Sequence, residues 1–171
     1  AVGFLEGRPV NAEDDSYYDL PGHAADVASL YQHCVRSIRH GLRSGVHGLP
    51  LIGSGDWNDG MNLVGIGGKG ESVWLAFFLC DVLRKFAPLA ARYGDPLFAE
   101  FCSEEGARLS RNVEQHAWDG EWYRRAWFDS DEPLGSSANP ECQIDSLPQS
   151  WSVISGAGDP QRSRQAMQSV D

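Results

Sequence analysis

The sequence predicts a mainly α-helical protein with one short β-hairpin. Apolar residues recur at helical spacing through most of the chain outside one glycine-rich segment. Asp-Pro pairs at 95–96 and 159–160 place an N-cap residue before a proline, a pattern typical of a helix start. Residues 45–70 contain nine glycines, which argues against a regular helix there and predicts a long loop.

The N-terminal part predicts a loop followed by a helix. Residues 1–22 hold glycines, prolines and acidic residues without a sustained period, so we expect an irregular approach segment. Residues 23–44 carry a single apolar stripe with steps of three and four, which predicts an amphipathic helix that stops at Gly45.

Residues 71–93 are apolar around almost the whole helical circumference, which predicts a helix buried on most sides. Pro88 should kink or end this helix near residues 85–87. Few other helices are predicted to cover it. We therefore expect an exposed apolar patch over residues 73–86 and self-association of the chain through that patch.

The remaining chain predicts three helices and a strand. The expected elements are a helix over 96–118, a turn over 118–122, a strand over 122–128, a loop over 129–140, a helix over 145–155 ended by Gly156, and a helix over 160–170. No terminating signal follows the last helix. We therefore expect residues 1–171 to form one piece of a larger helical domain.

The composition argues against several function classes. The chain has 171 residues, a formal net charge of −10 and a pI of about 4.8, so it lacks the clustered basic residues on which nucleic-acid binding depends. Six tryptophans and five tyrosines suit a neutral, stackable ligand such as a sugar. No apolar run approaches the ~20 residues of a membrane span, and no signal peptide is recognisable. Four cysteines without a CxxC pair predict no metal site and a reducing, cytoplasmic location.

The glycine-rich loop contains the densest group of functional side chains, namely Asp56, Trp57, Asn58 and Asp59. Carboxylates and amides bind sugar hydroxyls, and a tryptophan stacks on the apolar face of a sugar. A carboxyl group beside an indole is partly desolvated, which raises its pKa and favours a general acid. A calcium loop fails in register, because Gly60 stands where an oxygen ligand is needed. An Asx turn remains an alternative for one of the two carboxylates.

Two other patterns are less specific. Glycines at 65–70 resemble a phosphate loop, but Lys69 is followed by Gly70 and Glu71, which breaks the Walker pattern. An anion at the N-terminus of the following helix stays open. Tyr123, Arg124 and Arg125 lie between two tryptophans, which suits either a sugar or phosphate site or core packing with a surface ion pair.

Four motifs occur in an order that resembles glycoside hydrolase family 94, the family of cellobiose and chitobiose phosphorylases. They lie at residues 48–62, 68–75, 118–126 and 142–151. Within the family, the motifs are most similar to the phosphorylase-like domain of cyclic β-1,2-glucan synthetases and to β-1,2-oligoglucan phosphorylases. The resemblance implies that residues 1–171 are the central part of an (α/α)6 barrel.

The resemblance also implies a mechanism of inverting phosphorolysis of β-glucans, with β-1,2-linked glucans as the expected substrate. Asp59 maps to the general acid and Trp57 to the subsite of the transferred sugar. No cofactor is implied, because inorganic phosphate is the co-substrate and nucleophile. The family's phosphate ligands map beyond Asp171, so the chain alone is expected to be inactive, and other domains could attach the parent protein to a membrane.

Further residues within these motifs are expected to contact sugar. They are Asp56, Asn58, Glu71, Tyr123, Arg124 and Gln149. The sequence at 145–148 departs from the glutamate-containing segment of cellobiose phosphorylases, which argues against cellobiose.

Two alternatives remain. One is an inverting hydrolase, which needs a second carboxylate about 6.5–9.5 Å from the acid, with Glu71 or Asp145 as candidates. The other is a sugar-binding piece without turnover, in which Trp57 and residues 123–124 bind the ligand.

Overall fold

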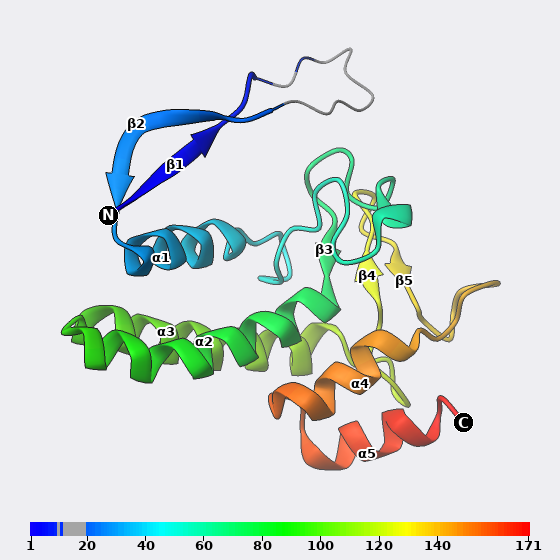
Figure 1. Cartoon of the computed structure of the whole chain (residues 1–171). Helices are drawn as coiled ribbons and strands as arrows, with labels where there is room; N and C mark the ends of the chain where they lie inside the picture. Colours follow the sequence, from blue (N-terminus) through cyan, green and yellow to red (C-terminus); the bar gives the residue numbers. More distant parts are fainter. Residues whose placement is uncertain (10, 12–19) are drawn as a thin grey trace. The chain divides into compact units, whose positions relative to one another are not determined.

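The computed structural model describes residues 1–9, 11 and 20–171, and it is mainly helical, as predicted (Figure 1). The described residues form five α-helices, one 3-10 turn and five short strands. The chain divides into two units, Ala1–His40 and Gly41–Asp171.

The first unit corrects the prediction for the N-terminal residues. β1 (Val2–Glu6) and β2 (Gly22–Ala28) form an antiparallel pair, and α1 (Leu30–Gly41) follows. The expected loop over 1–22 therefore contains a strand, and the expected helix over 23–44 begins seven residues late. The strands were not predicted because a short, half-exposed pair of strands shows no alternation of apolar and polar residues in its sequence. Residues 10 and 12–19 of the expected loop lie outside the described residues.

The second unit is built on two long helices, α2 (Val73–Tyr93) and α3 (Pro96–His116), which lie side by side in Figure 1. α4 (Ser146–Ser155) packs on α2, and α5 (Pro160–Gln168) packs on α4. The expected helix starts are confirmed, because the side chains of Asp95, Asp145 and Asp159 each accept a backbone N–H of the first helical turn.

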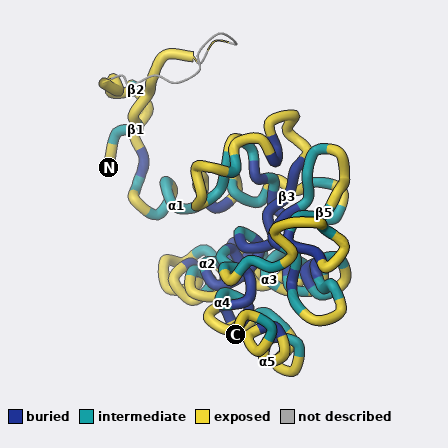
Figure 2. The backbone as a smooth tube through the Cα atoms, turned by 90° about the vertical axis from the view of Figure 1, so that its right-hand side faces the viewer, coloured by how far each residue is buried: buried dark blue, intermediate teal, exposed yellow. Residues whose placement is uncertain are grey.

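The core lies where α2 meets α3 and the segment that follows α3. Its fully buried members include Val73, Phe77, Val113 and Tyr123. In Figure 2 the buried backbone runs from β3 into α2. The large apolar side chains of residues 73–86 are therefore buried or half-buried, and the prediction that they form an exposed patch is wrong.

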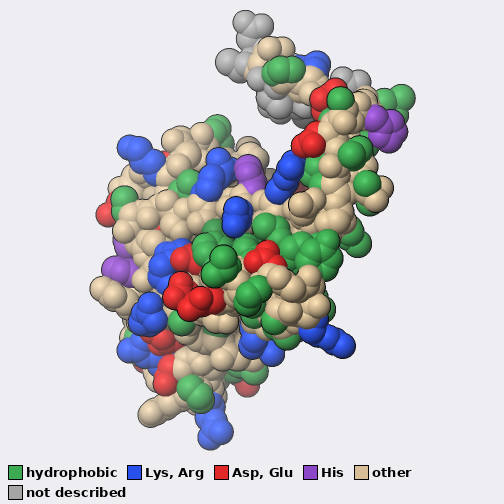
Figure 3. All heavy atoms as spheres, turned by 90° about the vertical axis from the view of Figure 1, so that its left-hand side faces the viewer, with side chains coloured by type: hydrophobic (Ala, Val, Ile, Leu, Met, Phe, Trp, Pro, Cys, Tyr) green, Lys and Arg blue, Asp and Glu red, His purple; other side chains and the backbone are tan. Residues whose placement is uncertain are grey.

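A smaller exposed apolar group lies at the other end of the helical pair. Leu89, Tyr93 and Leu97 are more than half exposed around the α2–α3 turn. Hydrophobic side chains gather on the face toward which this turn points (Figure 3). Self-association stays a prediction, and this end of the pair is the surface that could support it.

A three-stranded antiparallel sheet supports the glycine-rich loop. β3 (Glu71–Ser72), β4 (Ala126–Trp127) and β5 (Pro133–Leu134) pair in that order. The predicted strand over 122–128 is thus reduced to two residues, and β5 lies inside a segment predicted to be a loop. None of the helices in the described ranges is both long and apolar enough to cross a bilayer.

Of the two predicted effects of Pro88, an end of the helix is wrong, because α2 continues through Pro88 to Tyr93 and ends at Gly94 with a φ of 89°. A kink at Pro88 stays a prediction. Proline lacks the N–H that would pair with the carbonyl four residues earlier. The apolar contacts of α2 on both sides of Pro88 outweigh this loss.

We expect Pro88→Ala to raise the free energy of unfolding by about 1–3 kcal/mol, because alanine restores the helical hydrogen bond at an exposed position. Urea unfolding measures the change. Pro96→Ala is the matched control, since proline at the first position of α3 is favourable and its removal should bring no gain. A less stable Pro88→Ala variant would contradict the explanation.

Candidate active site

The loop that carries the acidic motif stands on the three-stranded sheet. The Ile52 N–H donates to the Gly70 carbonyl and the Ser72 N–H to the Pro50 carbonyl, so the two ends of the loop are held together. Ile52 and Val64 pack on Ala126 of β4 beneath it. The motif ends in a 3-10 turn, η1 (Asp59–Met61). A long glycine-rich segment thus has a fixed base.

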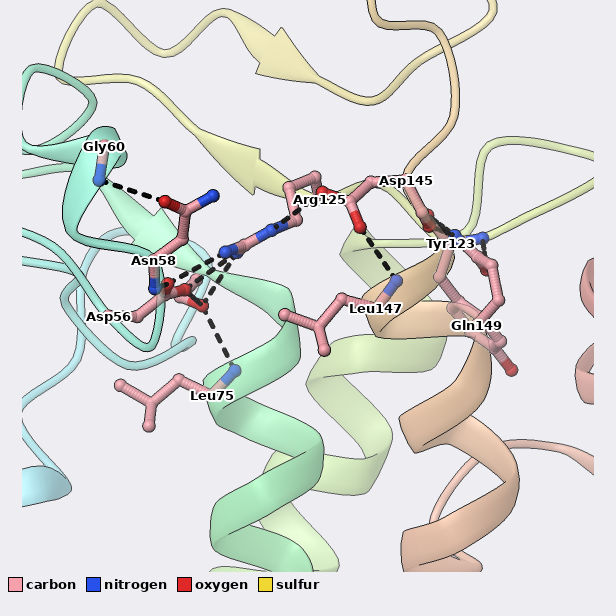
Figure 4. A network of polar contacts seen from close by, with 10 residues as sticks. Asp56, Asn58, Gly60, Leu75, Tyr123, Arg125, Asp145, Leu147 and Gln149 are labelled. Carbon is pink, nitrogen blue, oxygen red and sulfur yellow. Dashed lines mark hydrogen bonds and ion pairs between the residues drawn. The ribbon is translucent and has the colours of Figure 1, made fainter. Parts of the chain in front are cut away.

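Asp56 is held by Arg125 in a bidentate ion pair (Figure 4). The two guanidinium nitrogens Nη1 and Nη2 each donate to one carboxylate oxygen at 2.8 Å. The Ser72 hydroxyl donates to the same carboxylate at 2.6 Å, and its oxygen caps α2 by accepting the Leu75 N–H. Both charged side chains are almost fully buried. The pair therefore links the loop, the sheet and the start of α2.

Arg125 also faces a second carboxylate. Its Nε lies 3.2 Å from Oδ2 of Asp145, close enough for an ion pair but not aligned as a hydrogen bond. The other oxygen of Asp145 accepts the Leu147 N–H and caps α4. Asp145 is therefore engaged in two structural contacts.

The environment of Asp56 favours its charged form. Burial alone would raise the pKa of Asp56, but hydrogen bonds from Arg125, Ser72 and the Asn58 backbone, together with the Arg125 charge, lower it below its ordinary value. A carboxylate held ionised in this way is a poor proton donor. The Asx-turn alternative applies to Asp56, because its Oδ1 accepts the Asn58 N–H.

Asp59 and Trp57 have a different environment. Asp59 is exposed, and no described residue donates a hydrogen bond to its carboxylate. The Trp57 side chain is 74% exposed. The expected desolvation of the acid by this indole is thus not present within the described residues. Asn58 is exposed and caps η1 by accepting the Gly60 N–H.

Glu71 is placed inside the protein. It is 1% exposed and accepts three hydrogen bonds, from the His47 ring, the His47 N–H and the Leu49 N–H. A Cβ atom on Gly45 would stand 2.6 Å from the Glu71 side chain, so glycine is required for this close approach. Glu71 therefore anchors residues 45–49, and its contact with sugar stays a prediction that its burial does not favour.

Tyr123 and Gln149 are also internal. Gln149 is fully buried, and its amide accepts the Tyr123 N–H and donates to the Tyr123 carbonyl. The Tyr123 hydroxyl donates to Glu114 at 2.6 Å. Burial and this contact raise the pKa of Tyr123 far above its usual value. Both residues are buried, and their contact with sugar stays a prediction that this burial does not favour.

Arg124 points away from its neighbour Arg125. It donates to the His116 carbonyl at 2.9 Å and pairs with Asp119 at 2.6 Å, while its guanidinium covers the Trp127 ring. These contacts hold the end of α3 to the following turn. Core packing with an ion pair, the second alternative for this segment, therefore describes Arg124.

The glycines that resemble a phosphate loop already hold an anion. The Asp129 carboxylate accepts the N–H groups of Gly67, Lys69 and Gly70. The hydrogen bonds from Gly67 and Lys69 are the main reason that the pKa of Asp129 is lowered. Because these donors are occupied by a side chain of the same protein, the loop is not an open anion site.

Sequence reasoning missed the partnership between residues 56 and 125, which are 69 positions apart. It also missed the role of Asp129, 59–62 positions from the amides it binds. No local pattern reports such pairs. The one available signal was a second arginine beside Arg124 in an aromatic, apolar stretch, where a buried arginine needs a carboxylate partner.

A family model described as the glycosyl hydrolase 94 superfamily, catalytic domain, matches residues 6–171. The chain belongs to this family. The resemblance of the sequence to glycoside hydrolase family 94 is therefore confirmed.

Relatives of known function support the assignment. The chain is 46% identical over 171 residues to a cyclic beta-(1,2)-glucan synthase of Rhizobium meliloti (strain 1021). This alignment covers 99% of the chain and 6% of that protein. It is 37% identical to solabiose phosphorylase of Paenibacillus borealis, over 85% of this chain and 19% of that protein. It is 32% identical to cellobionic acid phosphorylase of Neurospora crassa, over 89% of this chain and 19% of that protein. The chain thus spans less than a fifth of each of these relatives.

We expect Asp56→Asn to lower the free energy of unfolding at pH 7 by about 3–5 kcal/mol, because it leaves the Arg125 charge without its main partner. The folded-state pKa of Asp56 is lowered, so its stabilising contribution is present above the unfolded pKa of about 3.9 and is lost as the pH falls through the folded value. The gap between wild type and variant should therefore narrow below about pH 4.

Urea unfolding at pH 7 and pH 3 measures this gap. The control is Asp26→Asn, which removes an exposed ion pair with Arg36 and should change stability by less than about 1 kcal/mol at both pH values. A gap for Asp56→Asn that stays constant with pH would contradict the role of the ionised carboxylate.

Proposed function

We propose that this chain carries the general acid of an enzyme that cleaves β-glucans by inverting phosphorolysis, with Asp59 as the proton donor. The observation that supports this choice is the division between the two carboxylates of the motif. Asp56 is buried and held ionised by Arg125, whereas Asp59 stands exposed on a one-turn helix whose base is fixed. Asp59 is the carboxyl group that can meet a substrate and exchange a proton.

In the proposed reaction, the Asp59 O–H protonates the glycosidic oxygen while that oxygen leaves the anomeric carbon. A phosphate oxygen attacks the same carbon from the opposite face, so a β-glucoside gives an α-glucosyl phosphate and a shortened glucan. Asp59 regains a proton from phosphate or solvent. Trp57 offers an exposed ring on which the transferred sugar can stack. The reaction needs no cofactor besides phosphate as co-substrate.

The positions of the other carboxylates favour phosphate over water as the nucleophile. A hydrolase needs a second carboxylate that activates water. The candidates for that role, Glu71 and Asp145, are both engaged in structural hydrogen bonds and ion pairs. Phosphate is already anionic and needs no such base.

The proposal extends to the domain and the linkage. We place residues 1–171 in the central part of an (α/α)6 barrel and assign β-1,2-linked glucan as the substrate. The barrel is supported by family membership and by the helical hairpin of α2 and α3. The linkage is supported by the 46% identity to a protein named as a cyclic beta-(1,2)-glucan synthase.

We expect Asp59→Asn, made in the complete enzyme, to lower turnover on β-1,2-glucan by about 10²–10⁴-fold, because the leaving sugar then departs without a proton. An aryl β-glucoside with a nitrophenol leaving group needs no protonation and should lose far less. Release of sugar phosphate from both substrates measures the effect. Equal losses on both would remove Asp59 from the role of general acid.

We expect the 171-residue chain alone to release no glucose 1-phosphate from β-1,2-glucan and phosphate. Alignment of the nucleophile supplies a large part of the rate. The two arginines of the aromatic segment, Arg124 and Arg125, are already paired with Asp119 and Asp56. The measurement compares the chain with its Asp59→Asn variant, and any turnover above that variant would mean that a phosphate site lies within these residues.

A further inference from the structure

We propose that Arg125 is a positioning residue for the general acid, acting on Asp59 through the Asp56 carboxylate. The inference rests on the proposed function, in which Asp59 donates the proton. Arg125 touches neither Asp59 nor the surface. Its effect is to fix the position and orientation of η1, the turn that carries Asp59.

The first step is that Arg125 itself is fixed. It is 1% exposed, its N–H donates to the Leu134 carbonyl at 2.8 Å, and its carbonyl accepts the Val73 N–H at 3.2 Å. Gly135, with a φ of 76°, lets the neighbouring strand approach so closely that a Cβ atom would lie 2.8 Å from the Arg125 nitrogen. The guanidinium therefore projects from a backbone that is held on both sides.

The second step is that Asp56 transmits this position to the turn. The carboxylate oxygen that accepts Arg125 Nη2 also accepts the Asn58 N–H at 3.1 Å. The Asn58 side-chain oxygen accepts the Gly60 N–H at 2.9 Å, and the Asn58 backbone carbonyl accepts the Met61 N–H at 3.0 Å. Figure 4 shows this path from Arg125 to Gly60. The peptide groups on both sides of Asp59 are therefore held by hydrogen bonds.

The third step is the chemistry of the arginine. Two parallel hydrogen bonds fix the plane of a carboxylate as well as its distance, whereas a lysine holds it at one point and leaves it free to rotate. Rotation of the Asp56 carboxylate would release the Asn58 N–H and with it the start of η1. The adjacent Arg124 cannot substitute, because it faces His116 and Asp119.

The consequence for catalysis is specific to the protonation step. A general acid must come within about 2.6–3.2 Å of the leaving oxygen, and a misplacement of about 1 Å costs on the order of 10²-fold in rate. A loosened turn should therefore slow substrates that need protonation and spare those that do not. Loss of fold would slow both equally.

The test uses Arg125→Lys in the complete enzyme, assayed on β-1,2-glucan and on a nitrophenyl β-glucoside. We expect kcat on the glucan to fall by about 10–100-fold with KM little changed, and kcat on the aryl glucoside to fall by less than about 3-fold. The matched control is Arg124→Lys, an equally conservative change in the adjacent, also ion-paired residue. It should affect the two substrates equally. Equal losses for Arg125→Lys, or a glucan-specific loss for Arg124→Lys, would overturn the proposal.

Two further variants keep the outcomes separate. Asp59→Asn is measured in the same assay. If it slows both substrates equally the proposed function fails, and if it is glucan-specific while Arg125→Lys is not, only the positioning role fails. Should Arg125→Lys not fold, Asp56→Asn replaces it, because it breaks the same link at its other end without a change in side-chain size. The same substrate ratio then supports or overturns the role.

Discussion

The buried ion pair between Arg125 and Asp56 is the interaction on which the rest of the second unit depends. The contacts of this pair join four segments. Arg125 directly precedes β4, Asp56 lies in the glycine-rich loop, Ser72 caps α2 and Asp145 caps α4. A charge left unpaired in this position would be strongly destabilising, so the four segments must meet together. Buried pairs add little net stability relative to apolar residues of similar volume. We therefore interpret the contribution of this pair as geometry, because it defines one arrangement of the four segments.

Acidic side chains perform the same task along the whole glycine-rich segment. Glu71 accepts the N–H groups of residues 47 and 49, Asp129 those of residues 67, 69 and 70, and Asp56 that of residue 58. A segment with nine glycines in 26 residues has much conformational freedom to lose and few backbone hydrogen bonds of its own. These carboxylates accept between one and three backbone N–H groups each, and so restrict the segment at separate points. The loop is thus ordered in part by its own Asp56 and in part by side chains from β3 and from the segment after β4.

This dependence explains which features could be predicted from the sequence. The starts of α3, α4 and α5 follow from local chemistry at Asp95, Asp145 and Asp159, and each was predicted correctly. Pro88 was misread, because its local effect is outweighed by packing along α2. In the candidate site, the motif could be found but not the environment of its members. Whether Asp56 or Asp59 is buried depends on a partner 69 positions away, which no local pattern reports.

The carboxylates near the loop differ in whether hydrogen bonds and ion pairs occupy their oxygens, and this difference bears on the approach of the phosphate in the proposed reaction. In the proposed phosphorolysis the attacking phosphate carries negative charge, so an unpaired carboxylate beside its path would repel it. In the described residues around the sheet, Asp56, Glu71, Asp129 and Asp145 all accept hydrogen bonds from backbone or cationic groups, which reduces the field that they present. Asp59, the proton donor of the proposed reaction, is the exposed carboxyl group of the motif and accepts no hydrogen bond from the described residues.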